Sequence, residues 1–156
     1  MALPLTPQPP LDPVALRLAQ TALFRRGLAA QLTLVLLIST GAYLGLVPTV
    51  FPSAPHFDLV GHFMLIGLLA FFTDGALAFR RIHPALAFPR AGALLVLAVA
   101  GIEEYAQRFS SRRSSDWLDF AADTLGVLAF SYLAGRVGGA ATPVPTEASA
   151  EAERRS

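Results

Sequence analysis

The stretch GIEEYAQRFSSRRSSDWLDFAAD, residues 101–123, places many charged side chains between two apolar segments. Residues 91–100 before it contain only Ala, Gly, Leu and Val, and the sequence TLGVLAF follows it from residue 124. One charged side chain at the centre of a bilayer costs about 2.5–3.5 kcal/mol on insertion scales. The stretch therefore indicates two membrane-spanning helices whose ends meet at a polar boundary.

The remainder of the chain extends this pattern. Of its 156 residues, 54% are hydrophobic and only 15% are charged, which is unusual for a soluble domain. Four apolar runs of about 20 residues are each long enough to cross about 30 Å of hydrocarbon as a helix. None alternates polar and apolar residues as a membrane strand would. The sequence predicts an all-α, four-helix transmembrane bundle with spans at Leu28–Val47, Phe57–Phe79, Ala91–Phe109 and Trp117–Val137.

Three regions follow from these runs. Residues 1–27 form an N-terminal arm whose first 13 residues include five prolines, which stop helices. Residues 14–26 are either an interfacial helix or the start of the first span; a cleaved signal peptide is disfavoured because the apolar run is too long. Residues 28–137 are the membrane domain. Residues 138–156 are small, polar and proline-containing, which predicts a disordered cytoplasmic tail.

Arginine sets the predicted orientation. Nine of the 12 basic residues, all of them arginine, flank the spans on one side, and three lie on the other side. Because cytoplasmic loops carry the excess of Lys and Arg, both termini are predicted to lie in the cytoplasm. The three exceptions either have a role at the outer surface or are neutralised by nearby acids. These exceptions are Arg108, Arg112 and Arg113.

Composition also excludes several classes of site. The chain has no cysteine, so it holds no disulfide and no cysteine-ligated metal or iron–sulfur cluster. A net charge of +1 gives no indication of nucleic-acid binding. No cofactor is expected, whereas metal binding and homo-oligomerisation are left open.

Polar residues gather at the predicted outer ends of the second and third spans. Asp58 and His62 are four residues apart, so they share one helix face near the start of the second span. Near the end of the third span, Glu104 and Gln107 are three residues apart, and Glu103 can also approach Gln107. Because polar groups that face lipid are costly, these side chains are predicted to face one another or water.

The fourth span opens with a third polar stripe. Asp116, Asp119 and Asp123 follow i, i+3, i+7 spacing, and the last two lie too far inside the span to serve as caps. Further along, Gly126 and Gly135 suit close helix packing. The three stripes predict one outward-facing polar pocket. Its predicted ligand-binding residues are Asp58, His62, Glu104, Gln107, Arg112, Arg113, Asp119 and Asp123.

Simpler roles remain open for several of these residues. Asp58 and Asp116 are each placed to cap a helix, where a carboxylate favours the positive end of the dipole. His62 alone is typical of a hydrogen-bonded packing residue, and either glutamate of the third span can pair with Arg108. Asp74 lies on roughly the opposite face from Asp58, so it is interpreted as a helix-interface residue that pairs with arginine, outside the pocket.

These motifs resemble the VanZ-like family of small bacterial membrane proteins. The family pattern has Asp, then His-Phe four residues later, Glu-x-x-Gln, an arginine, and Asp-x-x-x-Asn/Asp-Thr-x-Gly. The resemblance extends from about residue 28 to residue 135. The matching residues here are Asp58, His62-Phe63, Glu104, Gln107, Arg113 or Arg112, Asp119, Asp123-Thr124 and Gly126.

The chain departs from the family pattern at two positions. Leu59 replaces a lysine that often follows the first Asp, which removes a cation, and Asp123 replaces the common Asn, which adds a potential negative charge. The resemblance implies a multi-pass protein of the bacterial cytoplasmic membrane with a cell-envelope role. The family's namesake is linked to resistance to teicoplanin, a glycopeptide that binds cell-wall precursors outside the membrane.

Three functions compete for this pocket. In the first, a non-enzymatic envelope protein binds membrane lipid, a lipid-linked wall precursor or a glycopeptide, and Arg112 and Arg113 pair with phosphate or carboxylate. In the second, a membrane enzyme uses His62, Glu104 and Asp119 as acid–base groups, or uses the aspartates to hold a divalent cation against a lipid-linked substrate. In the third, the acids and histidine relay protons in a carrier.

Two features rank these functions. An enzyme needs a nucleophile or an activated water, and no serine or cysteine stands near the predicted pocket within the spans. A carrier needs polar groups at both ends of its spans, whereas the inner halves of these spans are nearly all apolar. The binding role is therefore favoured, the enzyme is the alternative, and the carrier comes third.

Overall fold

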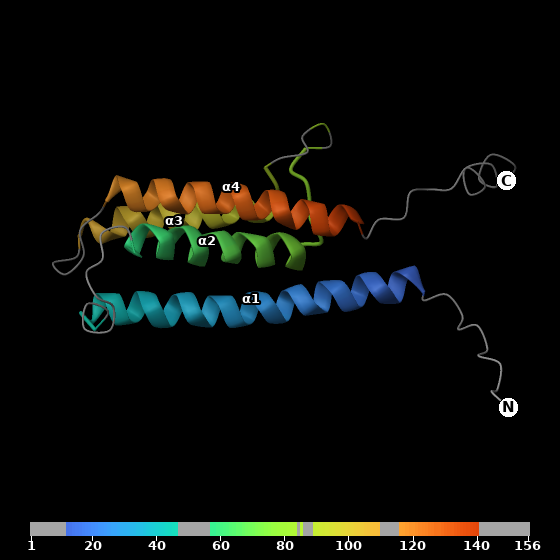
Figure 1. Ribbon diagram of the computed structural model, residues 1–156, viewed down its shortest axis with the longest axis horizontal. Helices are drawn as coiled ribbons and strands as arrows, with labels where there is room; N and C mark the ends of the chain where they lie inside the picture. The colour runs from blue at the N-terminus through green and yellow to red at the C-terminus, as the bar shows by residue number, and fades with distance from the viewer. Residues whose placement is uncertain (1–11, 47–56, 84, 86–88, 110–115, 141–156) are drawn as a thin grey trace, which may run out of the picture.

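The computed structural model describes residues 12–46, 57–83, 85, 89–109 and 116–140. These residues form four α-helices and no strand, with one isolated bridge between Arg81 and Arg90. This confirms the all-α fold class. The helices are α1 (Pro13–Tyr43), α2 (Phe57–Ala76), α3 (Ala91–Gln107) and α4 (Trp117–Ala140), as Figure 1 shows.

In the described part of the chain, three helices are long and apolar enough to cross a membrane: α1, α2 and α4. The helix α3 has 17 residues because it ends at Gln107, two residues before the predicted end of its span. At 1.5 Å per residue it is about 25 Å long, at the lower limit for a membrane-spanning helix. Crossing by α3, and with it a four-span topology, remains a prediction.

The first helix differs from the predicted division at residue 27. It runs without interruption from Pro13 to Tyr43, so residues 14–26 are the start of the same helix and not a separate interfacial one. Asp12 caps it by accepting a hydrogen bond from the Val14 amide at 2.9 Å, and proline occupies the first helical position, where its missing N–H costs nothing. The arm before residue 12 and the predicted tail beyond residue 140 lie outside the described residues.

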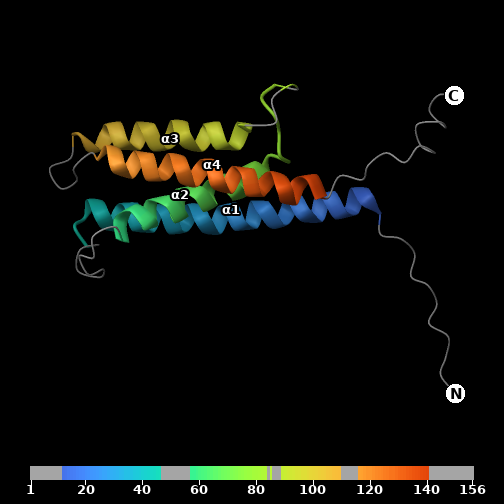
Figure 2. The same cartoon turned by 45° about the horizontal axis from the view of Figure 1, so that its top comes forward.

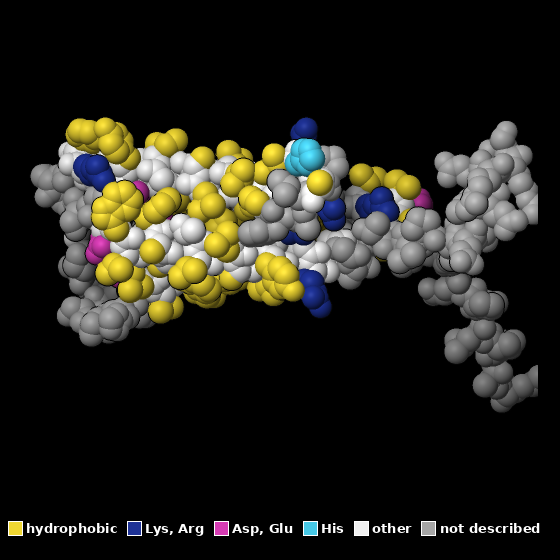
Figure 3. Space-filling model, turned by 90° about the horizontal axis from the view of Figure 1, so that it is seen from above, with side chains coloured by type: hydrophobic (Ala, Val, Ile, Leu, Met, Phe, Trp, Pro, Cys, Tyr) yellow, Lys and Arg dark blue, Asp and Glu magenta, His cyan; other side chains and the backbone are white. Residues whose placement is uncertain are grey.

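The helix α2 occupies the middle of the bundle. It packs against α1 on one side and against α3 and α4 on the other, and α3 also packs against α4 (Figure 2). Around it a small core forms, and hydrophobic side chains cover much of the visible face of the molecule in Figure 3, as expected for lipid contact. The core residues are Leu69 and Ala70 of α2, Ala93 and Val96 of α3, and Val127 of α4.

Glycine allows α2 and α4 to approach closely. A Cβ atom added to Gly126 would meet the backbone oxygen of Phe63, and one added to Gly67 would meet the backbone of Gly126. Small residues at such crossings let two helical backbones pack directly against each other. The predicted packing role of Gly126 is confirmed, and the crossing lies one turn along α4 from Asp123.

A buried polar contact ties three helices together at the opposite end of the bundle from His62. Asp74 is fully buried and accepts hydrogen bonds from the Ser131 hydroxyl at 2.5 Å and the Ala93 amide at 3.1 Å. It thereby caps the N-terminus of α3, whose own N-cap residue, Arg90, makes no side-chain cap bond. Arg90 instead donates to the Ser131 carbonyl at 2.6 Å. Asp74 is thus an interface residue, as predicted. Its hydrogen bonds come from a serine and from backbone amides, and the nearby charge of Arg90 acts on it electrostatically.

Candidate functional site

The described residues of the predicted pocket lie at one end of the bundle. The C-terminal ends of α1 and α3 and the N-terminal ends of α2 and α4 meet there (Figure 1). Of the eight predicted ligand-binding residues, six are described. Arg112 and Arg113 belong to the stretch between α3 and α4 that lies outside the described residues.

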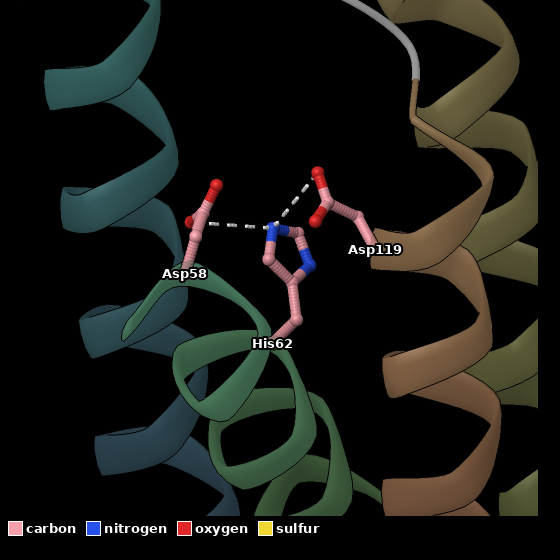
Figure 4. Close-up of side chains that lie close together, drawn as sticks. All are labelled: Asp58, His62 and Asp119. Atoms are coloured by element: carbon pink, nitrogen blue, oxygen red, sulfur yellow. Dashed lines mark ion pairs between the residues drawn. The ribbon is translucent and has the colours of Figure 1, made fainter. Parts of the chain in front are cut away.

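His62 is the centre of this end of the bundle. Its Nδ1 atom lies 3.0 Å from Oδ1 of Asp123. Its Nε2 atom lies 3.8 Å from Oδ2 of Asp119 and 3.9 Å from Oδ1 of Asp58 (Figure 4). Two i, i+4 pairs create this arrangement, one on α2 and one on α4, and the glycine crossing brings the two helix faces together. The structure therefore brings four predicted site residues into one cluster, here called the histidine cluster: Asp58, His62, Asp119 and Asp123.

The histidine cluster is open on one side only. The side chain of Asp58 is 82% exposed, whereas those of His62, Asp119 and Asp123 are 16%, 10% and 7% exposed. An ionised carboxylate only accepts hydrogen bonds, so the contact to ionised Asp123 assigns the N–H to Nδ1 of His62. The Nε2 atom then faces Asp119 and Asp58. This orientation suits a base or a metal ligand.

The capping roles left open by the sequence also occur. Asp116 accepts a hydrogen bond from the Leu118 amide at 2.9 Å and so caps α4. Asp58 lies in the first turn of α2, where its charge favours the helix dipole, and it also faces His62. For Asp58, the capping position and the place in the cluster are therefore compatible.

A second polar contact joins α3 to α1. Gln107 is fully buried and donates through Nε2 to Oε2 of Glu103 at 2.5 Å, and the Tyr43 hydroxyl donates to Oε1 of Glu103 at 3.4 Å. Glu103 and Tyr43 were not among the predicted site residues. The approach of Glu103 to Gln107, predicted from their i, i+4 spacing, is confirmed, whereas nothing in the sequence indicated that Tyr43 would reach α3.

Glu104 lies between these two groups. It is 7% exposed, and its Oε1 atom has no hydrogen-bond partner among the described residues; the same is true of Oε1 of Gln107. Glu104 is near enough to Asp119 for the two charges to interact. Since buried polar atoms are normally hydrogen-bonded, this end of the bundle has unused hydrogen-bonding capacity.

Arg108 makes a contact that the sequence did not indicate. Its guanidinium lies over the ring of Tyr105, 5.6 Å from the centroid, and over that of Trp117, at 5.5 Å, and it forms no ion pair with a described glutamate. Such cation–π contacts hold a guanidinium in place while it remains charged. A hollow of about 210 Å³ opens beside it. The residues that line the hollow are Gly101, Glu104, Tyr105, Arg108, Trp117 and Phe120.

The histidine cluster also contains donors for a metal. One ligand atom each from Asp58, His62 and Asp119 can be chosen so that all three lie within 4.8 Å of one another. Two carboxylates and an imidazole are common ligands of divalent transition metals.

Comparison of the chain with protein-family models, curated proteins and solved structures found no match. The fold and the site define the chain as a helical protein with candidate membrane spans and a histidine–carboxylate cluster at one end. The resemblance to the VanZ-like family stays a prediction, which rests on the motif residues quoted above.

Proposed function

We propose that this chain is a VanZ-like protein of the bacterial cytoplasmic membrane that crosses it four times, with both termini in the cytoplasm. Its histidine cluster faces the outer leaflet and binds the polar headgroup of a lipid or a lipid-linked cell-wall precursor. The distribution of arginine supports this orientation, because the described arginines other than Arg108 belong to the opposite end. They are Arg17, Arg25, Arg26, Arg80, Arg81, Arg90 and Arg136.

One observation carries the binding role. Glu104 and Gln107 are buried in the bundle, yet each has an oxygen that accepts no hydrogen bond from a described residue. Leaving such groups unpaired costs about 1–3 kcal/mol each. A bound headgroup with hydroxyl, amide or ammonium donors would satisfy them. This explains why the unpaired groups lie beside the exposed Asp58 rather than at the Asp74 end.

Basic residues complete the proposed site. Arg108 is held by two aromatic rings at the same end of the bundle, and Arg112 and Arg113 follow it closely in the chain. Guanidinium groups bind phosphate or carboxylate through two parallel hydrogen bonds. A headgroup that carries both an anion and hydrogen-bond donors therefore matches the arginines as well as the unpaired acceptor oxygens of Glu104 and Gln107. Binding a wall precursor, or the glycopeptide that targets it, would give teicoplanin-type tolerance.

The alternative is an acid–base enzyme that acts on a lipid-linked substrate. The contact between His62 and Asp123 favours it, because a carboxylate that orients an imidazole is the usual arrangement around a general base. The catalytic candidates in that case are His62, Glu104 and Asp119. Such proton transfer typically contributes about 10²–10⁴-fold to a rate.

The two functions are separated by three variants expressed at matched membrane levels: Arg113→Gln, His62→Ala and Asp119→Asn. Binding of a lipid-linked precursor and glycopeptide tolerance are measured for each. The binding role predicts weaker precursor binding and lower tolerance in Arg113→Gln, with a smaller effect in His62→Ala. Gly61→Ala is the control, because a Cβ atom there meets nothing within 4 Å.

Two results would reject the binding role. Loss of tolerance in His62→Ala and Asp119→Asn with undiminished precursor binding would favour the enzyme. Wild-type behaviour of all three variants in both measurements would mean that the polar end of the bundle is structural, and both functions would then fail.

A further inference from the structure

With His62 in its neutral form and its Nδ1–H donated to Asp123, the histidine cluster brings three acceptor atoms together without a donor between them. A neutral imidazole has one N–H and one lone pair, and the contact to Asp123 places the N–H on Nδ1. The lone pair of Nε2 then faces Oδ2 of Asp119 at 3.8 Å and Oδ1 of Asp58 at 3.9 Å (Figure 4). These three atoms repel one another unless a positive charge lies among them.

We propose that this charge is a single divalent transition-metal ion bound by Asp58, His62 and Asp119, with Asp123 as the residue that orients the imidazole. The distances distinguish an ion from a proton. Hydrogen bonds from Nε2 would require about 2.7–3.2 Å, shorter than either observed separation. Two ligands that each lie about 2.1 Å from one ion are about 3.4 Å apart at a tetrahedral angle and at most about 4.2 Å apart, a range that includes both observed separations. The two carboxylate oxygens lie within 4.8 Å of each other, so binding one ion draws the exposed Asp58 side chain slightly inward.

Asp119 provides an independent reason to expect a ligand. Its side chain is 10% exposed and points toward the His62 ring in Figure 4, yet it accepts no hydrogen bond from any residue that the structure describes. The described partner of this carboxylate is Nε2 of His62, and 3.8 Å is too long for a hydrogen bond. An ion bound between the two groups would give the carboxylate a closer partner than any described residue provides.

Asp123 has the geometry of a supporting residue. Histidines that bind metals usually donate their other ring N–H to a carboxylate, which fixes the ring and raises its basicity. The 3.0 Å contact between Asp123 and Nδ1 of His62 matches this arrangement. The family pattern commonly has Asn here, so the charge of Asp123 is a feature of this chain.

The exposed position of Asp58 gives the ion a route from solvent and leaves room for further ligands. Three protein ligands leave at least one coordination position of the ion open. If the proposed function holds, a phosphate oxygen of the headgroup occupies that position, and the ion bridges the acids to an anion that they would otherwise repel. This bridging step rests on the proposed function, whereas the metal site does not.

The ligand set also selects the metal. Magnesium and calcium prefer all-oxygen sites, whereas imidazole together with carboxylate favours zinc, manganese or ferrous iron. The chain has no cysteine, and its only other histidines are His56 and His83, so few competing sites exist. Zinc and manganese are therefore the appropriate probes.

The test uses the full chain, stripped of metal and placed in phosphatidylcholine nanodiscs. Zinc is titrated by calorimetry, and manganese is followed by electron paramagnetic resonance. We expect one ion per chain, at least tenfold weaker binding in His62→Ala and Asp119→Asn, and about 10–100-fold weaker binding in Asp123→Ala. His83→Ala should bind as the wild type does, because its exposed imidazole lies at the opposite end of the bundle, where it accepts a hydrogen bond from the Ala85 amide. Magnesium at equal concentration should not compete.

The absence of saturable binding by helical wild-type protein would overturn the metal site and assign the charge to a doubly protonated His62. Unchanged binding in both His62→Ala and Asp119→Asn would also overturn it. Precursor binding that persists without metal binding would leave the proposed function intact and reject the ion. Metal binding without precursor binding would support the ion and reject the proposed function.

Discussion

Two kinds of buried acid occur in this bundle, and their hydrogen bonds separate them. Both carboxylate oxygens of Asp74 are occupied, by Ser131 and by the Ala93 amide, so this acid holds three helices together. Glu104 is nearly as buried, but its Oε1 atom has no hydrogen-bond partner among the described residues, and the described partner of Asp119 is Nε2 of His62 at 3.8 Å, beyond hydrogen-bond distance. The first arrangement contributes to stability, whereas the second lowers stability unless a ligand binds.

Asp74→Ala should destabilise the protein by about 1–3 kcal/mol, because it leaves a buried hydroxyl and the first turn of α3 without an acceptor. The measurement is reversible unfolding in detergent micelles, followed by circular dichroism. Thr33→Ala is the control, since this exposed hydroxyl bonds only to the Ala29 carbonyl of its own helix. Equal stability of the two variants would contradict a structural role for Asp74.

Asp119→Asn should behave in the opposite way. Removing a buried charge that accepts no hydrogen bond from the described residues should leave stability unchanged or raise it by about 0.5–2 kcal/mol, while ligand binding is lost. The same unfolding measurement, made on metal-free protein, tests this. A destabilisation as large as that of Asp74→Ala would show that Asp119 is held by structural partners and would remove it from the proposed site.

At the scale of helices, the α2–α4 crossing determines whether the histidine cluster can form. Gly126→Ala would push a methyl group into the backbone of Phe63, and such overpacking typically costs about 1–3 kcal/mol. We expect lower stability together with weaker zinc binding, because the added methyl group would displace α4 and move Asp119 and Asp123 away from His62. Gly61→Ala, which meets no neighbouring atom within 4 Å, should change neither property. Normal zinc binding in Gly126→Ala would mean that the crossing does not position the cluster.

Helix positions were largely predictable because each span is one apolar run bounded by polar or proline-containing breaks. The helix α1 begins at Pro13, ahead of the predicted span, since arginines and a low local hydropathy do not interrupt a helix; that residues 14–26 begin the first span was one of the two alternatives left open. The third span was predicted to end at Phe109, two residues beyond the end of α3 at Gln107. The α4 cap at Asp116 was one of the roles left open by the position of this residue directly before the fourth span.

The pocket was predictable only in part. Helical spacing predicted the pairs on α2 and α4, and the cost of facing lipid predicted that they would meet. Which atoms approach depends on how α4 rotates against α2, and that is fixed by packing between residues far apart in the chain. For the same reason Tyr43 and the stacking of Arg108 on Trp117 were missed.

The whole molecule is polarised along its length. Seven described arginines belong to one end, and the histidine cluster lies at the other with Glu103, Glu104 and Arg108. In a bacterial membrane this asymmetry favours the arginine end in the cytoplasm. The proposed function depends on this orientation, because cell-wall precursors are bound by glycopeptides outside the membrane.

Side-specific cysteine labelling tests this orientation most directly, and the chain has no native cysteine to interfere. Phe109→Cys lies at the histidine-cluster end, where Phe109 is 79% exposed, and Ala85→Cys lies at an exposed position of the opposite end. In spheroplasts treated with a membrane-impermeant maleimide, the account predicts labelling of Phe109→Cys at once and of Ala85→Cys only after lysis. Labelling of Ala85→Cys in intact spheroplasts, with Phe109→Cys protected until lysis, would place the cluster in the cytoplasm and contradict the proposed function.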